Sequence, residues 1–252
     1  MFFVVDIGNS NIKFTSFDND KVVGFSKLQT DKNKIKYDEI DDIVKGGNIK
    51  GIIVSSVVPE LTNVIRNKLE QFSDKIITFK DDNLVLNIKK YPSNKPDFID
   101  RRAGQDMIAD ICYGIKKYEK NFLTIDLGTA GVINCVDGGG YYTGSTIFSG
   151  LVTLSKYMSV CSQLKDFDVI PQDYNISPYY EQSINGGVFW GGIGMLEKNV
   201  EIAIKKSNLT NPKICVTGGY FKEIKDFVNF KYDAYDPYMT AIGLYEILKM
   251  NI

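Results

Sequence analysis

The sequence predicts an α/β protein built from two similar halves. A strand that ends in Asp-x-Gly and returns as a second strand occurs twice, in residues 1–17 and again in residues 121–137. Apolar strands also alternate with segments of helical periodicity, an order typical of α/β folds. One motif repeated at about half the chain length indicates an internal duplication, with the division between residues 116 and 121.

Composition limits the possible functions. The chain has 252 residues, of which 44% are hydrophobic, enough for one large core or two modest ones. Its 30 Lys and Arg nearly balance 31 Asp and Glu, so we expect no nucleic-acid partner. The chain has no His, which excludes His-based catalytic triads and His metal sites. Proton transfer must fall to Asp, Glu, Lys, Tyr or Cys.

The sequence also predicts a cytoplasmic protein. The first ten residues, MFFVVDIGNS, lack the basic segment and long apolar run of a secretory signal. No apolar stretch approaches the ~20 residues of a membrane span, so we expect no membrane partner. The four cysteines are far apart and form no CxxC pair, so we expect reduced thiols: Cys112, Cys135, Cys161 and Cys215.

The first half is predicted to hold a hairpin, a strand and two helices. Residues 1–17 read as strand, Gly-Asn-Ser turn and strand, and the apolar run 51–58 reads as a buried strand. A helix follows from Pro59, with four apolar residues on one face: Leu61, Val64, Ile65 and Leu69. Two prolines predict a loop over residues 89–100, which leads into a helix beginning near Ala103.

The second half repeats the hairpin and then becomes mainly helical. A glycine-rich loop is predicted after it, from Gly138 to Gly144. The remaining predicted elements are helices over 151–164 and 187–205, a strand over 213–219 and a terminal helix over 239–250.

The two Asp-x-Gly turns, at Asp6 and Asp126, carry the first functional prediction. Glycine lets the backbone approach a phosphate and point its N–H groups at it, and an adjacent carboxylate suits hydrated Mg²⁺. A single such turn would also suit an ordinary hairpin, but two matched copies favour a nucleotide site. Gly218 and Gly219, after a later strand, suit either a contact with adenine or ribose or a simple strand-to-helix turn. The P-loop motif and a Rossmann GxGxxG after a strand are both absent.

Seven motifs in order give the chain a family resemblance. They are DIGNSNIKF (6–14), SSVVP (55–59), AGQD (103–106), IDLGTA (125–130), GGVFWG (186–191), VTGGY (216–220) and MTAIGL (239–244). Over nearly its whole length the chain resembles type III pantothenate kinase, in the acetate and sugar kinase, Hsp70 and actin superfamily. The resemblance implies two ribonuclease H-like (actin-like ATPase) half-domains, at residues 1–117 and 118–252. Each would be a mixed five-stranded sheet flanked by helices, with a cleft between the two.

The resemblance also implies an activity, the ATP-dependent phosphorylation of pantothenate to 4'-phosphopantothenate in the first step of coenzyme A biosynthesis. The cofactors would be ATP with Mg²⁺ and a monovalent cation, K⁺ or NH₄⁺. Asp106, in the family's GxD motif, would be the general base; without the resemblance it would read as a first-turn helix acid. Asp126 would bind the monovalent cation and Asp6 the Mg²⁺.

The predicted binding residues fall into two sets. Those for ATP are Asp6, Ile7, Gly8, Asn9, Ser10, Asn11, Ile12, Lys13, Thr129, Gly218 and Gly219. Those for pantothenate are Tyr91, Gly104, Gln105, Asp106, Met107 and Tyr180. Two of these depart from the family's pattern, Met107 where Arg is usual and Tyr180 where Thr is usual, and Ser149 replaces a Pro. Arg101 or Arg102 would then supply the missing positive charge.

Two other functions stay open. The departures would suit a kinase of another small alcohol or sugar, and a weakly active relative would act as a nucleotide-binding regulator of the Bvg accessory factor type. The family resemblance and the apolar segment 187–196, GVFWGGIGML, lead us to expect a homodimer. The same segment would also suit a buried core helix.

Overall fold

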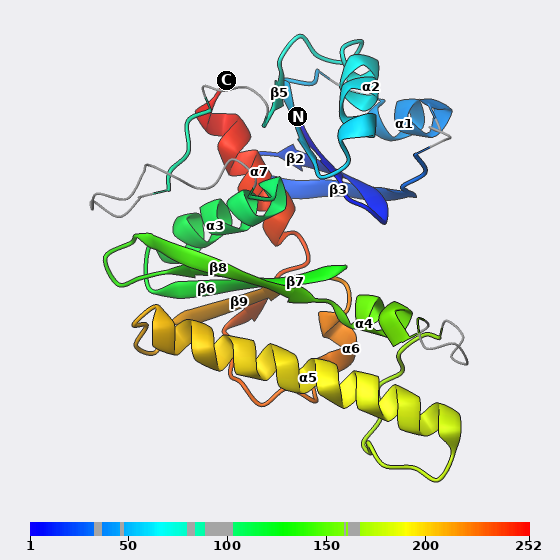
Figure 1. Ribbon diagram of the computed structural model, residues 1–252. Coiled ribbons are helices and arrows are strands. Elements are labelled where there is room, and N and C mark those ends of the chain that lie inside the picture. Colours follow the sequence, from blue (N-terminus) through cyan, green and yellow to red (C-terminus); the bar gives the residue numbers. More distant parts are fainter. Residues whose placement is uncertain (33–36, 46–47, 80–83, 89–102, 159, 161–166) are drawn as a thin grey trace. The chain divides into compact units, whose positions relative to one another are not determined.

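The chain folds into two compact units. The computed structural model describes residues 1–32, 37–45, 48–79, 84–88, 103–158, 160 and 167–252. The first unit comprises residues 1–117 and 238–252, and the second comprises residues 118–237 (Figure 1). The predicted second half, residues 118–252, includes the last fifteen residues. In the structure they belong to the first unit, because the terminal helix packs on the first sheet.

The first unit contains a mixed five-stranded sheet in the order β3-β2-β1-β4-β5. Its strands are β1 (Phe2–Ile7), β2 (Asn11–Asp18), β3 (Lys21–Gln29), β4 (Gly51–Ser56) and β5 (Ile76–Thr78). The first three strands form an antiparallel meander, whereas β4 and β5 run parallel to β1. The predicted hairpin and mixed sheet are confirmed.

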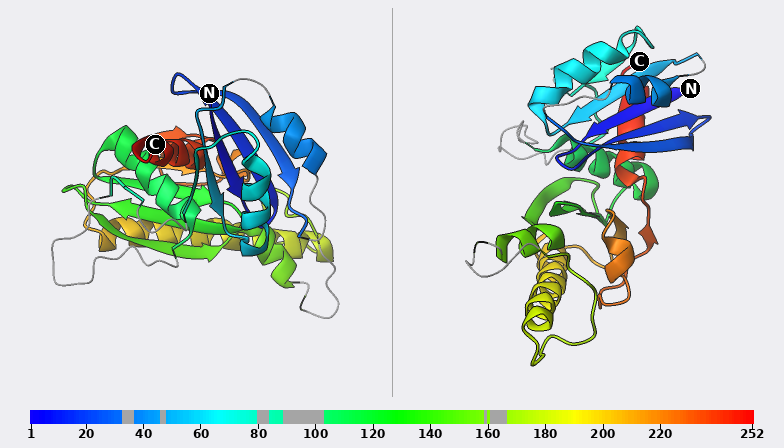
Figure 2. Two further views of the ribbon diagram at one scale, coloured as in Figure 1. Left: turned by 90° about the horizontal axis from the view of Figure 1, so that it is seen from above. Right: turned by 90° about the vertical axis from the view of Figure 1, so that its right-hand side faces the viewer.

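Helices cover both faces of this sheet (Figure 2). On one face, α1 (Tyr37–Val44) and α2 (Pro59–Leu69) pack on alternate residues of β1 and β4. Leu61, Ile65 and Leu69 of α2 are buried as predicted, but Val64 is 36% exposed. On the other face lies α7 (Met239–Met250), whose Tyr245 ring stacks on Phe17 at 4.3 Å between centroids.

The helix α3 (Gln105–Tyr118) packs against α7 at close range. A Cβ on Gly243 of α7 would collide with the carbonyl oxygen of Ala109, so glycine is required for this approach. Beside that contact, Thr240 Oγ1 donates a hydrogen bond of 2.8 Å to Asp110 Oδ1, and Asp110 is buried. A buried carboxylate needs such a partner, so this bond fixes how the two helices cross.

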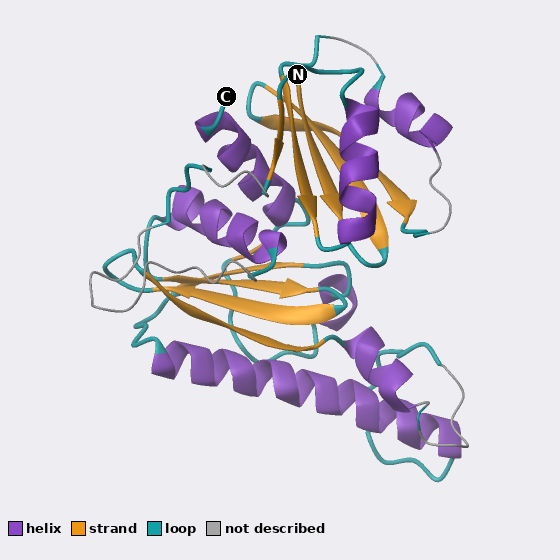
Figure 3. Ribbon diagram, turned by 45° about the horizontal axis from the view of Figure 1, so that its top comes forward, coloured by secondary structure: helices purple, strands orange, loops and turns teal. Residues whose placement is uncertain are grey.

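The second unit repeats the sheet topology of the first. Its strands are β6 (Phe122–Leu127), β7 (Ala130–Val136), β8 (Tyr142–Ser149), β9 (Lys213–Thr217) and β10 (Ala234–Tyr235), in the order β8-β7-β6-β9-β10. Figure 3 draws the strands of both units in orange. Here too the first three strands are antiparallel and the last two run parallel to the first. The predicted internal repeat is therefore present at the level of topology.

The core of the second unit lies between its sheet and the long helix α5 (Tyr180–Lys206). Phe189 of α5 is fully buried and makes an edge contact with Phe227 at 5.0 Å. The unit also contains α4 (Leu151–Met158) and the short α6 (Phe221–Ile224).

Three predicted boundaries in the second unit differ from the structure. Helix α5 begins at Tyr180, seven residues before the predicted start. The added residues are polar or only partly buried except for Gly186, so they show no apolar periodicity that would have predicted the earlier start. The strand β8 begins at Tyr142, inside the predicted glycine-rich loop. Helix α4 reaches Met158, and most of residues 159–164, also predicted helical, lie outside the described part of the chain.

Two further findings concern membrane spans and cysteines. Among the described residues, none of the helices combines the length and apolar character needed to cross a membrane. Cys112, Cys135 and Cys215 are buried and form no disulfide, and Cys161 lies outside the described residues.

Candidate functional site

The first Asp-x-Gly turn joins β1 to β2. Gly8 N donates to Asn11 O at 2.9 Å and closes a tight turn. Thr30, after β3, holds that turn from outside, since its hydroxyl donates to Gly8 O at 2.7 Å. Asn9 and Ser10 at the tip are exposed. The turn is thus fixed by hydrogen bonds at its base and open at its tip.

The side chains of the predicted nucleotide-binding residues around this turn lie on both faces of the sheet. Ile7 and Ile12 are buried in the core that faces α1 and α2, so only their main chain is available to a ligand. Asp6 and Lys13 are direct partners in the β1–β2 register and lie on the opposite face of the sheet. Lys13 Nζ lies 3.6 Å from Asp6 Oδ2, and the Lys13 side chain is 51% exposed.

The pKa of the Asp6 carboxyl is raised by its surroundings. Burial raises this pKa above the ordinary value of 3.8, and the attraction of Lys13 opposes this shift only in part. The negative charge of Asp106 raises the pKa further, which places the two carboxylates within electrostatic range of each other. Ser55, the partner of Asp6 in the β1–β4 register, is fully buried.

Asp106 lies in the first turn of α3. Its Oδ1 accepts a hydrogen bond of 2.9 Å from Met107 N, and a Cβ on Gly104 would collide with the same oxygen. The carboxylate therefore folds back over the start of its own helix. The neighbouring Gln105 accepts a hydrogen bond of 2.7 Å from Ser56 N, at the end of β4, while Met107 is buried. Tyr91, Arg101 and Arg102 lie outside the described residues.

The second Asp-x-Gly turn joins β6 to β7. Asp126 is the fifth of six residues in β6, as Asp6 is in β1, and Gly128 N donates to Ala130 O at 3.1 Å. The carbonyl of Thr129 accepts hydrogen bonds from Gly150 N at 3.1 Å and from Thr153 Oγ1 at 2.6 Å. The first turn of α4 thereby holds this loop in place.

Gly218 and Gly219 follow β9, next to the second turn. Gly218 has φ +98°, a conformation that favours glycine, and a Cβ there would collide with Leu127 at the end of β6. The Tyr235 hydroxyl donates to Gly218 O at 3.3 Å. Burial raises the pKa of Tyr235, and the negative charges of Asp236 and Asp126 raise it further. Asp126, Tyr235 and the glycine loop therefore lie together at one end of the second sheet.

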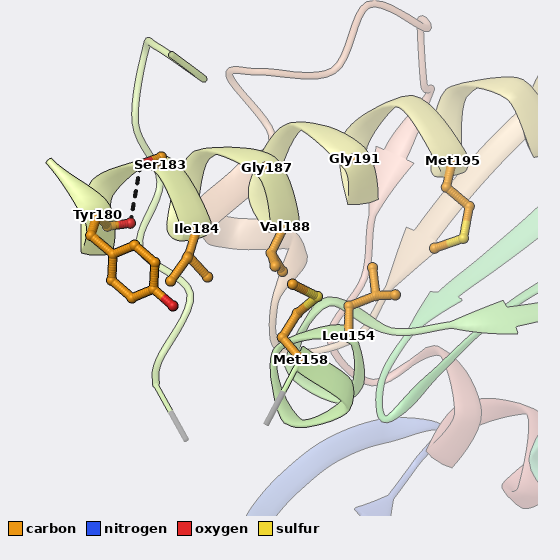
Figure 4. A pocket seen from close by; sticks show the side chains of 9 residues that line it. All are labelled: Leu154, Met158, Tyr180, Ser183, Ile184, Gly187, Val188, Gly191 and Met195. Carbon is orange, nitrogen blue, oxygen red and sulfur yellow. Dashed lines mark hydrogen bonds between the residues drawn. The ribbon is translucent and has the colours of Figure 1, made fainter. Parts of the chain in front are cut away.

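Tyr180 begins α5 and is 62% exposed. It lines an apolar groove of about 640 Å³ between α4 and α5 (Figure 4). The remaining lining residues are Leu154, Met158, Ser183, Ile184, Gly187, Val188, Gly191 and Met195.

The structure thus brings the predicted residues together in two groups. The first unit holds the Asp6 turn with Gly104, Gln105, Asp106 and Met107, and the second holds Asp126, Thr129, Gly218 and Gly219. Within the described residues, no group of three or more His, Cys, Asp or Glu side chains is arranged to hold a metal. Three further residues of the site, Gly150, Thr153 and Tyr235, belong to no local motif and contact it from distant parts of the sequence, so no sequence signal predicts them.

Comparison with known proteins identifies relatives over the whole length. The family model described as "Type III pantothenate kinase" matches residues 2–201. A protein of that name from Citrifermentans bemidjiense is 29% identical over 264 aligned positions, which cover 100% of both chains. The same name belongs to a protein from Bacillus cytotoxicus with 28% identity, covering 100% of this chain and 97% of that one.

Solved structures show the same fold. A Baf family protein from Campylobacter jejuni superposes with a TM-score of 0.59 at 22% identity, covering 99% of this chain and 98% of that one. At this identity, the match establishes the architecture of the chain and nothing about its chemistry.

Proposed function

The chain belongs to the type III pantothenate kinase family, and we propose that it transfers the γ-phosphoryl group of ATP to the terminal hydroxyl of pantothenate. This reaction is the first step of coenzyme A biosynthesis. The observation that carries the proposal is the proximity of Asp106 to Asp6 within the first unit. Gln105 accepts a hydrogen bond from Ser56 N, next to the strand partner of Asp6, and the charge of Asp106 raises the pKa of the Asp6 carboxyl. An ordinary first-turn helix acid has no need of a second carboxylate near it, in a side chain that is only 15% exposed.

Asp106 is the general base in this proposal. Its carboxylate accepts the proton of the pantothenate hydroxyl while that oxygen bonds to the γ-phosphorus and the bond from phosphorus to the bridging β,γ-oxygen breaks. The products are 4'-phosphopantothenate and ADP. Asp106 lies in the first turn of α3, where the partial positive charge of the helix N-terminus faces it.

The two Asp-x-Gly turns bind the phosphates of ATP. Residues 6–13 supply main-chain N–H groups and the Lys13 ammonium, and Thr129 supplies the matching turn of the second unit. Asp6 is the residue that would hold Mg²⁺, since a carboxylate with the charge of a second carboxylate, Asp106, near it suits a hard divalent cation. Bound there, Mg²⁺ would neutralise charge on the phosphates.

Asp126 would hold the monovalent cation, and Gly218 with Gly219 would contact the adenosine. The support is their common location at the end of the second sheet, beside the Tyr235 hydroxyl. Gly218 is confined to its loop conformation, so its main chain is preorganised for a close contact with a ligand.

The pantothenate site includes Gly104, Asp106 and Met107, with Tyr91 and Tyr180 as further candidates. Met107 carries no charge, so Arg101 or Arg102 pairs with the substrate carboxylate in this proposal. Arg101→Ala and Arg102→Ala should each be assayed for the KM of pantothenate. One of them is expected to raise it by ~10-fold or more, in line with the ~1.5–3 kcal/mol of a charged hydrogen bond.

The decisive experiment measures ADP release with pantothenate. We expect Asp106→Asn to lower kcat by ~10²–10⁴-fold while the KM for ATP stays within about threefold. Asp74→Asn, an exposed aspartate of the same unit, is the matched control and should keep wild-type kinetics. An Asp106→Asn enzyme with more than a third of wild-type kcat would exclude Asp106 as the base.

The same assay separates the alternatives. Wild-type turnover with another small alcohol or sugar, but not with pantothenate, would identify a kinase of different specificity. Binding of ATP without turnover of any acceptor would identify a nucleotide-binding regulator. The intact pair of Asp6 and Asp106 favours the kinase, because a pure binder has no use for a base.

A homodimer is the second proposal, and the apolar groove between α4 and α5 supports it. Large apolar residues on the two helices that form the groove are exposed, among them Val152 and Tyr157 of α4 and Tyr180 of α5. Gly191 lines the groove, and a Cβ added there would meet open space. Light scattering should give twice the 28.4 kDa chain mass for wild type and one chain mass for Gly191→Glu. Ile202→Glu, on α5 outside the groove, is the control; a monomeric wild type would refute the dimer.

A further inference from the structure

The end of β4 has a main-chain donor that its sheet does not use. Val57 N donates to Ile7 O of β1 at 3.0 Å, so the preceding amide, Ser56 N, points to the other side, toward β5. The register of β4 with β5 ends at the Val54–Thr78 pair, two residues before Ser56. Gln105 Oε1 accepts from Ser56 N at 2.7 Å and takes the place of a strand neighbour.

The Ser56 side chain is held in place by hydrogen bonds. Its hydroxyl oxygen accepts hydrogen bonds from Val58 N at 3.0 Å and from Thr62 Oγ1 at 2.8 Å, at the start of α2. Thr62 is buried, with 4% of its surface exposed. The end of β4 and the start of α2 therefore form one hydrogen-bonded junction, and the Gln105 side chain attaches α3 to it.

The remaining contacts of α3 described above lie farther along the helix. Ala109 meets Gly243, and Asp110 bonds to Thr240, both on α7. Asp106 stands between these contacts and the Gln105 bond. The first turn that carries Asp106 is therefore held from both sides.

We propose that Gln105 is a positioning residue, whose amide oxygen fixes the first turn of α3 on the end of β4 and so sets the place of the Asp106 carboxylate beside Asp6. This inference rests on the proposed function of Asp106. It revises the expectation that Gln105 contacts pantothenate, because its amide oxygen is already committed to Ser56. A side chain that acts on the geometry of a base should change kcat, whereas a substrate contact should change KM.

The test compares three variants. Gln105→Met keeps the length of the side chain and removes the acceptor, whereas Gln105→Glu keeps an acceptor oxygen. Gln71→Met is the matched control, since it removes a glutamine hydrogen bond to Asp41 beyond the opposite end of α2. We expect Gln105→Met to lower kcat by ~10–100-fold, with both KM values within about threefold, because displacing a catalytic group by ~1 Å costs about this much. Gln71→Met should keep the wild-type kcat.

Residue-resolved amide exchange gives a readout that needs no activity. Ser56 N–H reports the anchor, and Met107 N–H, which donates to Asp106 Oδ1, reports the place of the carboxylate. Both amides should exchange at least ~10-fold faster in Gln105→Met than in wild type, and Ser56 should stay protected in Gln105→Glu. If Gln105→Met fails to fold, the protection of the Ser56 amide in wild type and in Gln105→Glu still tests the hydrogen bond to Gln105.

The outcomes separate this inference from the proposed function. Failure of the wild type to turn over pantothenate would refute the proposed function. The exchange rates of the Ser56 and Met107 amides would still test whether Gln105 holds the first turn of α3 on β4. A Ser56 amide that exchanges freely in wild type would overturn the anchor itself. Loss of Ser56 protection with kcat within twofold of wild type, or a rise in the KM of pantothenate alone, would overturn the positioning role.

Discussion

The carboxylate of Asp106 depends on the absence of a side chain two residues earlier. Its Oδ1 lies so close to Gly104 that a Cβ there would occupy the same space, and it accepts a hydrogen bond from Met107 N. Any larger residue at position 104 would push the carboxylate out of this position. At the scale of single residues, the position of the Asp106 carboxylate therefore requires glycine at position 104.

Gly104→Ala should lower kcat by ~10–100-fold, because the added methyl group displaces Asp106 Oδ1 from its place over the helix start. Steady-state kinetics check this, and the KM for ATP should stay within about threefold. Gly138→Ala is the control, since a Cβ there would meet nothing within 4 Å. A Gly104→Ala enzyme with kcat within twofold of wild type would contradict the prediction.

Site residues can be predicted from the sequence only where they belong to a local motif. The repeated Asp-x-Gly pattern was enough to single out Asp6 and Asp126, whereas Asp106 needed the family resemblance. The bond between Ser56 N and Gln105 joins residues 49 positions apart, and one partner is a main-chain amide. A main-chain donor has no residue-type signal, so no motif could reveal that contact.

At the scale of secondary structure, long apolar elements were predictable and short or edge elements were not. The predicted β1, β4 and α7 carry runs of fully buried residues. The strand β3 alternates exposed and half-buried residues and has no fully buried position, so its pattern is weak. The strands β5 and β10 have three and two residues, too few to show any period. These two strands are recognised only by their pairing with β4 and β9.

The short pairing of β9 with β10 depends on one carboxylate. Asp233 Oδ2 accepts from Ile214 N at 2.9 Å, Oδ1 bonds Lys213 Nζ at 2.6 Å, and Asp233 N donates to Ile214 O. These bonds hold the pKa of Asp233 below its ordinary value of 3.8, the Lys213 hydrogen bond being the largest cause. The carboxylate thus favours the fold in its ionised form.

Asp233→Asn should destabilise the protein by ~1 kcal/mol at pH 7, a value reduced for partial exposure, because it removes the charge from both bonds. Since the folded pKa is lowered, the loss is present above pH 3.8 and disappears as the pH falls through the folded pKa. Denaturant melts at pH 7 and below pH 3.8 check the sign. Asp226→Asn, an exposed control, should show no such pH dependence, and an equal loss at both pH values would contradict the prediction.

At the scale of the whole chain, two sheets of one topology are built from different lengths of sequence. The repeat was visible in the sequence because both copies keep the Asp-x-Gly turn at the same strand position. The return of α7 to the first unit was not visible, because helical periodicity shows which face is apolar and not which sheet will cover it.

Truncation after Pro237 should therefore unfold the first unit. It removes several fully buried side chains, among them Met239, Leu244, Ile247 and Leu248, each worth ~1.5–3 kcal/mol. Their sum rivals the whole stability of a domain, about 5–15 kcal/mol. Hydrogen exchange with mass spectrometry should show β1 and β4 losing protection while β6 and β9 keep theirs. Retained protection of β1 in the truncated chain would show that α7 is dispensable.

The late position of α7 has a consequence for biosynthesis. When the ribosome has finished β1 to β5, the helix that closes one face of their sheet does not yet exist, and residues 118–237 must be translated first. At ~5–20 residues per second this delay is on the order of ten seconds. Throughout that interval the nascent chain presents Phe2, Phe17 and Ile53 without their final cover, and it is a natural client for chaperones near the exit tunnel.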